Sequence, residues 1–248
     1  MSNSLASKLL AEFIGTFAFV FIGAGAAAVV GDGVGLPGIT AIAFAHGLTI
    51  MVFAFAYGTV SGGHMNPAVT VGVLAVGAMR AGEAAGYIVS QLVGGVIGAL
   101  VLGAVLGGAA TGLGTPALAH DLALGATTVA VSPAAGFVIE AVLAFFLVTV
   151  VLSTAVAGRA GNLAPLAIGM TLTLNIIMGG ALTGAAFNPA RALGPMIVTG
   201  NLSDAWLYMA APIVGAIVAA LVHTGLTRLA RQPATTAEPA QPVQTPAG

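Results

Sequence analysis

One short stretch occurs twice in this chain of 248 residues and limits how the chain can fold. The copies read SGGHMNPAVT at residues 61–70 and TGAAFNPAR at residues 183–191. Each is a loop of small residues that ends in Asn-Pro-Ala and is followed by a mostly apolar run. A proline at the first position of a helix is a start signal, because its missing N–H would be unpaired there anyway. Each copy therefore predicts a loop that leads into a short helix.

The two predicted short helices, residues 67–76 and 189–198, cannot cross a membrane. Ten residues of helix rise about 15 Å, roughly half the thickness of the hydrocarbon core of a bilayer. Half-helices at matching places in two halves of a chain indicate an inverted repeat with its site near the bilayer midplane.

The composition indicates that the chain lies mostly in lipid. Hydrophobic residues make up 58% of it, charged residues only 5%, and the mean hydropathy is +1.09. Apolar runs long enough to span a bilayer cover residues 9–30, 39–57, 84–106, 134–156, 163–181 and 205–226. The first run lacks a small-residue cleavage site, so we expect it to be retained as a helix. The predicted fold is an all-α membrane protein with six transmembrane helices and two re-entrant half-helices in an inverted repeat.

The repeat can be followed residue by residue. Asn66 and Asn188 are 122 positions apart, as are the runs Gly-Leu-Thr at 47–49 and Gly-Met-Thr at 169–171, while Glu12 and Glu140 differ by 128. Three spans per repeat, an odd number, force the two repeats into opposite orientations. We expect a first repeat at residues 1–110, a connecting extracellular loop at 111–133, a second repeat at 134–229 and a disordered cytoplasmic tail at 230–248, rich in Pro, Ala, Thr and Gln.

The charged residues predict the orientation. When six spans are threaded through the membrane, five basic residues fall on the side of the termini: Lys8, Arg80, Arg159, Arg228 and Arg231. The sixth, Arg191, lies in the second Asn-Pro-Ala loop. The acidic residues on the opposite side are Asp32, Asp121 and Asp204. Short cytoplasmic loops carry an excess of Lys and Arg, so both termini are expected to be cytoplasmic, in a multi-pass protein of the cell (plasma or inner) membrane.

The paired Asn-Pro-Ala loops make the sequence similar to the aquaporin, or major intrinsic protein, family over about residues 9–229. This resemblance implies a passive channel that assembles as a homotetramer in the lipid bilayer and needs no cofactor, metal or nucleic acid. It implies that the pore motifs are Asn66, Pro67, Ala68, Asn188, Pro189 and Ala190.

The chemistry of paired half-helices suits a small neutral solute. Their N-termini, each with about half a positive charge, would point at the bilayer centre and repel cations and protons. The amides of Asn66 and Asn188 could donate to a passing oxygen. Non-helical backbone is tolerated at this depth only where it lines a watery path. The residues expected to line it are Gly62, Gly63, His64, Gly184, Ala186 and Phe187.

The family resemblance also implies a narrow outer filter built from His46, Ile176, Ala185 and Arg191. Typical water-specific filters resemble Phe, His, a small residue and Arg, whereas here the His stands at the second-span position and Ile replaces the fifth-span His. This set is similar to that of plant tonoplast intrinsic proteins. We therefore expect water to pass together with ammonia, urea or hydrogen peroxide, and we expect Arg191 and His46 to supply donors and a fixed positive charge.

Several alternatives remain at this stage. Glycerol facilitators typically carry Asp where this chain has Ala192, and they have an aromatic wall in the filter that is missing here. A proton-coupled transporter could use Glu12 and Glu140, although the resemblance favours a role for these carboxylates in bracing the re-entrant loops. A junction protein with a blocked filter is a third possibility, and His64 and His120 are candidates for pH regulation. The chain is predicted not to be an enzyme, because it has no His-Glu-x-x-His run, Gly-x-Ser-x-Gly elbow or phosphate loop.

Overall fold

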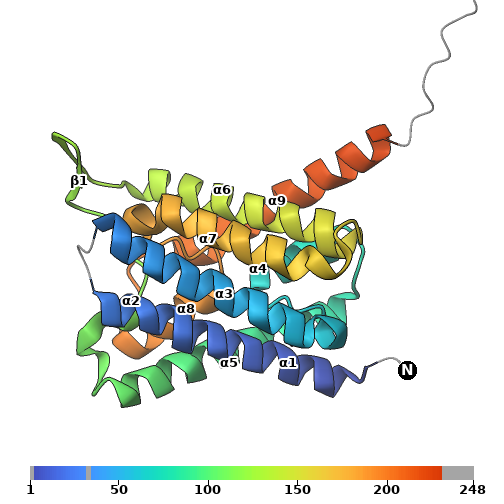
Figure 1. Ribbon diagram of the computed structural model, residues 1–248, viewed down its shortest axis with the longest axis horizontal. Helices are drawn as coiled ribbons and strands as arrows, with labels where there is room; N and C mark the ends of the chain where they lie inside the picture. The colour runs from blue at the N-terminus through green and yellow to red at the C-terminus, as the bar shows by residue number, and fades with distance from the viewer. Residues whose placement is uncertain (1–2, 32–34, 231–248) are drawn as a thin grey trace, which may run out of the picture.

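The computed structural model describes residues 3–31 and 35–230. Six helices in this part are long and apolar enough to cross a membrane, and they run side by side (Figure 1). The first consists of α1 (Leu5–Ala18), the π-helical η1 (Phe19–Ala24) and α2 (Gly25–Val30). The others are α3 (Gly35–Ser61), α5 (Ala81–Val105), α6 (Pro133–Val151) with its π-helical end η3 (Leu152–Val156), α7 (Ala164–Thr183) after the 3-10 turn η4 (Gly161–Leu163), and α9 (Ala205–Ala230).

Two short helices complete the predicted set. They are α4 (Pro67–Ala75) and α8 (Pro189–Thr199), and each begins at the proline of an Asn-Pro-Ala motif. The predicted fold of six spans and two half-helices is confirmed. Helix α9 ends at Ala230, the first residue of the predicted tail. Residues 231–248, which include Arg231, lie outside the described residues, as does Asp32.

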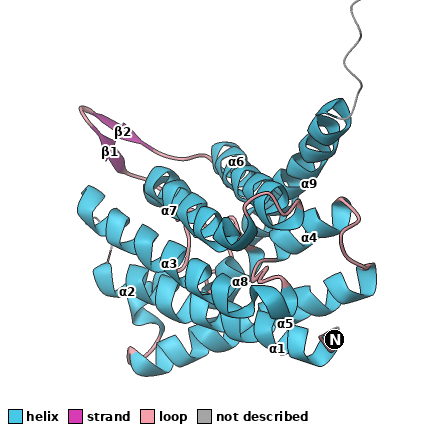
Figure 2. Cartoon of the chain, turned by 45° about the vertical axis from the view of Figure 1, so that its right-hand side comes forward, coloured by secondary structure: helices cyan, strands magenta, loops and turns pink. Residues whose placement is uncertain are grey.

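Each half-helix packs against the other repeat. The long helices pair as α1 with α5, α3 with α7 and α6 with α9. Helix α4 of the first repeat packs against α9 of the second, while α8 of the second packs against α5 of the first (Figure 2). The half-helices are therefore held inside the bundle, where their N-terminal residues are buried.

Helices α3 and α7 cross where two glycines meet. A Cβ atom on Gly47 would lie 2.6 Å from the carbonyl oxygen of Gly169, and a Cβ on Gly169 would lie 2.6 Å from that of Gly47. Only glycine permits so close an approach, which is the usual way that helices pack in lipid. The two glycines stand 122 positions apart, like the two asparagines, so equivalent residues of the two copies meet here.

The loop between the repeats contains more structure than the sequence indicated. It forms a 3-10 turn, η2 (Ala109–Gly114), and an antiparallel hairpin of β1 (Leu122–Leu124) and β2 (Thr127–Val129). The hairpin projects at the end of the bundle opposite to the N-terminus (Figure 1). Gly125 starts its two-residue turn with a φ of 60°, a conformation that glycine adopts without steric cost. Strands of three residues are too short to leave a clear alternating pattern.

Candidate pore

The two Asn-Pro-Ala motifs meet inside the bundle and bind each other reciprocally. The side-chain amide of Asn66 donates from Nδ2 to the carbonyl oxygen of Phe187 at 3.1 Å. The amide of Asn188 donates to the carbonyl oxygen of Met65 at 2.9 Å. Met65 and Phe187 are the residues just before the two asparagines, so the two hydrogen bonds are equivalent, with the two motifs exchanged. They join the N-termini of α4 and α8.

Each asparagine also caps the helix that it begins. Asn66 Oδ1 accepts from the backbone N–H of Ala68 at 2.8 Å, and Asn188 Oδ1 accepts from Ala190 at 3.0 Å and Arg191 at 3.3 Å. The prolines between them stand at the first helical position, where no N–H is needed. An amide NH₂ group has two hydrogens, and the reciprocal bonds use one of them. One N–H of each asparagine is therefore left for another acceptor.

The loops before the two asparagines share an unusual backbone. The non-glycine residues Met65, Ala185 and Phe187 have positive φ angles of 48°, 41° and 29°, and Gly63 has a φ of 64° at the position equivalent to Ala185. Such conformations cost side-chain-bearing residues on the order of 1–3 kcal/mol each. Favourable contacts elsewhere must hold the loops in this shape.

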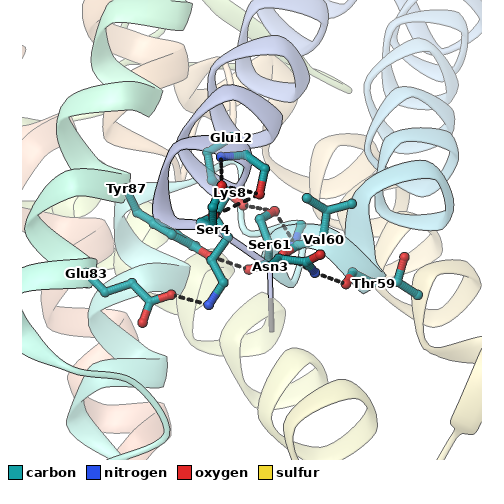
Figure 3. Close-up of polar contacts among 11 residues, drawn as sticks. Asn3, Ser4, Lys8, Glu12, Thr59, Val60, Ser61, Glu83 and Tyr87 are labelled. Carbon is teal, nitrogen blue, oxygen red and sulfur yellow. Dashed lines mark hydrogen bonds and ion pairs between the residues drawn. The ribbon is translucent and has the colours of Figure 1, made fainter. Parts of the chain in front are cut away.

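Glu12, from α1, supplies those contacts to the first loop (Figure 3). Its Oε1 accepts from the Ser61 hydroxyl at 2.7 Å and the His64 N–H at 2.9 Å. Its Oε2 accepts from the Met65 N–H at 2.6 Å and from Nε2 of Gln91 at 2.7 Å. The carboxyl group is fully buried and faces the loop on both oxygens.

Glu140, from α6, does the same for the second loop. Its Oε1 accepts from the Thr183 hydroxyl at 2.6 Å and the Ala186 N–H at 3.0 Å, and its Oε2 accepts from the Phe187 N–H at 2.5 Å. Sequence reasoning missed Ser61 and Thr183, although they are 122 positions apart like the asparagines. That shared offset was the available signal.

Further contacts tie the helix ends to these loops. The hydroxyl of Tyr87 donates to the carbonyl oxygen of Ser61 at 2.7 Å, and the hydroxyl of Tyr208 donates to that of Thr183 at 2.6 Å. These carbonyls belong to the last residues of α3 and α7.

Other polar contacts lie near the start of the chain. Asn3 donates to the carbonyl oxygens of residues 59 and 60, and the Lys8 ammonium pairs with a carboxylate oxygen of Glu83 at 2.6 Å (Figure 3).

A small cavity of about 20 Å³ lies beside the two asparagines. Its polar wall consists of Gly62, Gly63, His64, Asn66 and Asn188, and its apolar wall of Ile50, Val69, Leu147, Val151, Ile168 and Leu172. A cavity needs roughly 10–15 Å³ to hold a water molecule, so this one has space for about one. A water molecule in this cavity would find hydrogen-bond partners only on its polar side. The loop residues Gly184, Ala186 and Phe187 lie outside this cavity.

His64 is fixed by a chain of polar side chains. Its Nδ1 lies 3.1 Å from the Thr70 hydroxyl, and Nε2 of Gln91 donates to the same hydroxyl at 3.0 Å. Since Gln91 also binds Glu12, the chain connects the loop brace to a residue of the cavity wall. The edge of the His64 ring meets Tyr87 with the ring centroids 5.2 Å apart.

The four expected filter residues are all buried. His46, Ile176, Ala185 and Arg191 each have an exposed fraction of 3% or less. Nδ1 of His46 lies 2.9 Å from the carbonyl oxygen of Ile42. Because a carbonyl only accepts, Nδ1 carries the hydrogen, and Nε2 is the atom left for a solute.

Three polar atoms of the expected filter residues lack a protein partner within the described residues. They are Nε2 of His46 and Nε and Nη1 of Arg191. Buried polar atoms without partners are costly, so these atoms are suited to bind a small polar molecule. Phe19 holds the His46 ring in a T-shaped contact with centroids 5.3 Å apart. Nothing in the sequence pointed to Phe19.

The remaining candidates lie apart from this path. His120 is exposed in the connecting loop before the hairpin. Over residues 3–31 and 35–230, no group of three or more His, Asp or Glu residues is arranged to hold a metal ion. The acidic residues that the pore region does contain, Glu12 and Glu140, are occupied by the loops.

Comparison with known proteins identifies the architecture. The family model described as "Major intrinsic protein" matches residues 1–223. The chain belongs to the major intrinsic protein family. Members of this family are channels and not enzymes, and the chain is accordingly an integral, multi-pass channel for water and small solutes.

Individual relatives agree with this assignment. Aquaporin TIP4-4 of Zea mays is 39% identical over 223 residues, which are 88% of this chain and 85% of that protein. Glycerol uptake facilitator protein-like 6 of Lactiplantibacillus plantarum is 41% identical over 215 residues, 86% of this chain and 94% of that protein. The X-ray structure of the aquaglyceroporin from Plasmodium falciparum superposes with a TM-score of 0.76 at 22% identity, covering 91% of this chain and 98% of that one, which supports the major intrinsic protein fold.

Proposed function

We propose that this channel conducts water in single file, admits ammonia, urea or hydrogen peroxide as well, and excludes ions and protons. The observation that carries the proposal is the reciprocal pairing of Asn66 and Asn188. It leaves one N–H on each amide next to a cavity with space for about one water molecule. A water oxygen that accepts from both amides turns its hydrogens away from the centre, which interrupts proton relay along the file.

The exclusion of cations has a second source in the proposed pore. Helices α4 and α8 both begin at the asparagines, so the positive ends of two helix dipoles meet there. An ion that leaves its hydration shell would find the apolar wall of Val69, Leu147 and Leu172 on one side. Neutral solutes lose much less on entering such a passage.

The filter atoms support passage of small solutes that both donate and accept hydrogen bonds. In its neutral form His46 offers an acceptor at Nε2, while Arg191 offers donors at Nε and Nη1. A donor and an acceptor in one filter would suit ammonia, urea or hydrogen peroxide as well as water. Because the Nδ1 hydrogen of His46 binds the carbonyl oxygen of Ile42, Nε2 of the neutral ring would act as an acceptor rather than as the donor expected from the sequence.

Glycerol is the second candidate solute, because one relative of 41% identity is named a glycerol uptake facilitator protein. No Phe, Tyr or Trp side chain is present among the filter residues His46, Ile176 and Ala185 to contact the carbon chain of glycerol. Glycerol is therefore disfavoured as the main solute. Proton-coupled transport through Glu12 and Glu140 is a weaker candidate, because the re-entrant loops use oxygens of both carboxyl groups.

We further propose that both termini are cytoplasmic, in the plasma or inner membrane, and that four copies assemble with a pore in each. The orientation rests on the basic residues Lys8, Arg80, Arg159 and Arg228, which belong to helix ends and loops on one side of the bundle. The two repeats, residues 1–110 and 134–229, would form one channel rather than separate domains, because their half-helices pack on each other's spans.

Stopped-flow light scattering of proteoliposomes tests the solute range. Vesicles with the purified chain should shrink rapidly in a sucrose gradient with a low activation energy, and should re-swell rapidly in a urea gradient. Fast re-swelling in glycerol would make glycerol the better assignment, and no re-swelling in any solute would leave a water-selective pore.

The filter assignment has its own test. His46→Phe removes the Nε2 acceptor and should reduce urea and ammonia flux more than water flux. The same percentage loss for every solute would count against the assignment of His46 to the filter.

A further inference from the structure

A second, larger pocket lies at the end of the bundle where the N-terminus and the end of α9 are found. Its volume is about 490 Å³. Its lining residues are Val76, Ala78, Val156, Ala157, Arg159, His223, Thr224, Thr227 and Arg228. None of them lines the small cavity beside Asn66 and Asn188.

Three elements build the pocket. Helix α9 contributes His223, Thr224, Thr227 and Arg228, which share one helical face because they stand at positions i, i+1, i+4 and i+5. The end of α4 and the turn after it contribute the apolar floor. The π-helical end of α6 and its following loop contribute Arg159.

The loop that carries Arg159 is shaped locally. The N–H of Ala157 donates to the carbonyl oxygen of Leu152 at 3.0 Å, which closes the last π turn. Gly158 then has a φ of 68°, a value that glycine adopts readily, and turns the chain away from the helix. Arg159 follows directly, so its position depends on this helix end.

The pocket carries positive charge without a matching carboxylate. No acidic residue lines it, and the ion pair found among residues 3–31 and 35–230 joins Lys8 to Glu83 elsewhere on this side. In the same ranges neither Arg159 nor Arg228 has a salt-bridge partner. Two arginines that line one cavity supply several N–H donors and positive charge, which suit an anion with several oxygens.

We propose that this pocket binds the phosphate group of an anionic membrane phospholipid. Arginine binds phosphate through paired N–H donors, and basic pockets between transmembrane helices on the cytoplasmic side suit anionic head groups. Val76, Ala78 and Val156 provide an apolar wall next to the charges. On α9, Leu221 and Leu226 are close in sequence to the pocket residues and have exposed side chains that acyl chains can contact. This apolar surround favours a lipid over free phosphate, which would use the same two arginines.

Native mass spectrometry of the full chain tests the proposal. The protein is purified into mixed micelles with equal amounts of phosphatidylglycerol and phosphatidylcholine. Each arginine near a membrane surface contributes about fivefold to the binding of an anionic lipid, so Arg159→Gln with Arg228→Gln should weaken retention of phosphatidylglycerol by about 25-fold. Arg80→Gln is the matched control, because Arg80 is exposed on the same side and does not line the pocket. It should change retention by less than about fivefold.

Two further measurements separate the outcomes. Osmotic water permeability of the double variant should equal that of the original chain, which shows that it is folded and tests the proposed channel independently. Inorganic phosphate is added at constant ionic strength. If it displaces phosphatidylglycerol and stabilises the protein without lipid, the pocket takes a soluble anion and the lipid assignment is wrong. Equal retention of phosphatidylglycerol by the original chain and the double variant would overturn the site itself.

Discussion

Replacing Glu12 by glutamine should destabilise the protein without closing it to water. The carboxylate of Glu12 accepts hydrogen bonds from Ser61, His64, Met65 and Gln91, two on each oxygen. A glutamine has one oxygen and one NH₂ group, so whichever way it turns, its NH₂ group faces two donors. The size of the loss depends on which of these donors can adapt.

On each side of the carboxyl group one donor can adapt and one cannot. The Ser61 hydroxyl can rotate and the Gln91 amide can flip, so that each then accepts from the new NH₂ group. The backbone N–H groups of His64 and Met65 are fixed, and one of them loses its acceptor. An unpaired buried N–H costs about 1–3 kcal/mol, and the surviving bonds weaken when the acceptor is no longer charged. We expect a loss of about 3 kcal/mol in the free energy of unfolding.

Thermal unfolding in detergent, followed by the loss of monodisperse protein, measures this change. For a chain of this size about 3 kcal/mol corresponds to a decrease of about 6–12 °C in Tm. Glu83→Gln is the matched control, because that carboxylate binds the Lys8 ammonium near the surface. Such an ion pair is worth at most about 1 kcal/mol, or about 2–4 °C. Glu140→Gln should resemble Glu12→Gln, since Ala186 and Phe187 take the places of the fixed donors.

The bracing argument fails if Glu12→Gln and Glu83→Gln lower Tm equally. It also fails if Glu12→Gln leaves Tm unchanged and removes solute uptake driven by a pH gradient, because Glu12 would then be a proton carrier. Passive osmotic shrinkage at the original rate per folded molecule, together with a lowered Tm, is the expected result.

Three further substitutions test the packing, the filter and the helix ends. Gly47→Ala should push α3 away from α7 and lower the free energy of unfolding by about 1–3 kcal/mol. Gly58→Ala is its control, because a Cβ added there meets nothing within 4 Å, and it should leave the free energy of unfolding unchanged or raise it by up to about 1 kcal/mol. The Tm values of the two variants measure the difference. Arg191→Val should raise proton leak into proteoliposomes at least about tenfold, corresponding to about 1.4 kcal/mol, as read by an internal pH dye. Tyr208→Phe should lower stability by about 1 kcal/mol in the same Tm assay, because the carbonyl of Thr183 loses its donor.

The spans and half-helices could be predicted because lipid imposes strong rules on sequence. Helix length, apolar composition and the prolines after Asn66 and Asn188 located the helices closely, and α8 was expected at 189–198 and ends at Thr199. The offset of 122 between equivalent residues identifies the two loops as copies of each other from the sequence alone. These signals are local, or repeat at a fixed distance.

The supporting contacts could not be predicted, because they depend on where distant helices cross. Gln91 connects Glu12 to Thr70 and has no counterpart in the second repeat. Tyr87 and Tyr208 are 121 positions apart, and at the same distance from Gln91 the chain has Pro212. Phe19 reaches His46 from within the π-helical η1, whose extra residue leaves no clear mark on an apolar sequence. Contacts that break the repeat symmetry leave no internal copy with which to compare them.

The reciprocal hydrogen bonds of Asn66 and Asn188 also affect the order in which the protein can be assembled during synthesis. The acceptor of Asn66 is the carbonyl of Phe187, 121 residues later in the chain. At about 5–20 residues per second, the ribosome needs about 6–24 s to make that segment. During this interval the first re-entrant loop has no partner loop, but Glu12 is already present and can hold the N–H groups of His64 and Met65. The contacts that hold the first re-entrant loop can therefore form before the second half of the channel has been made.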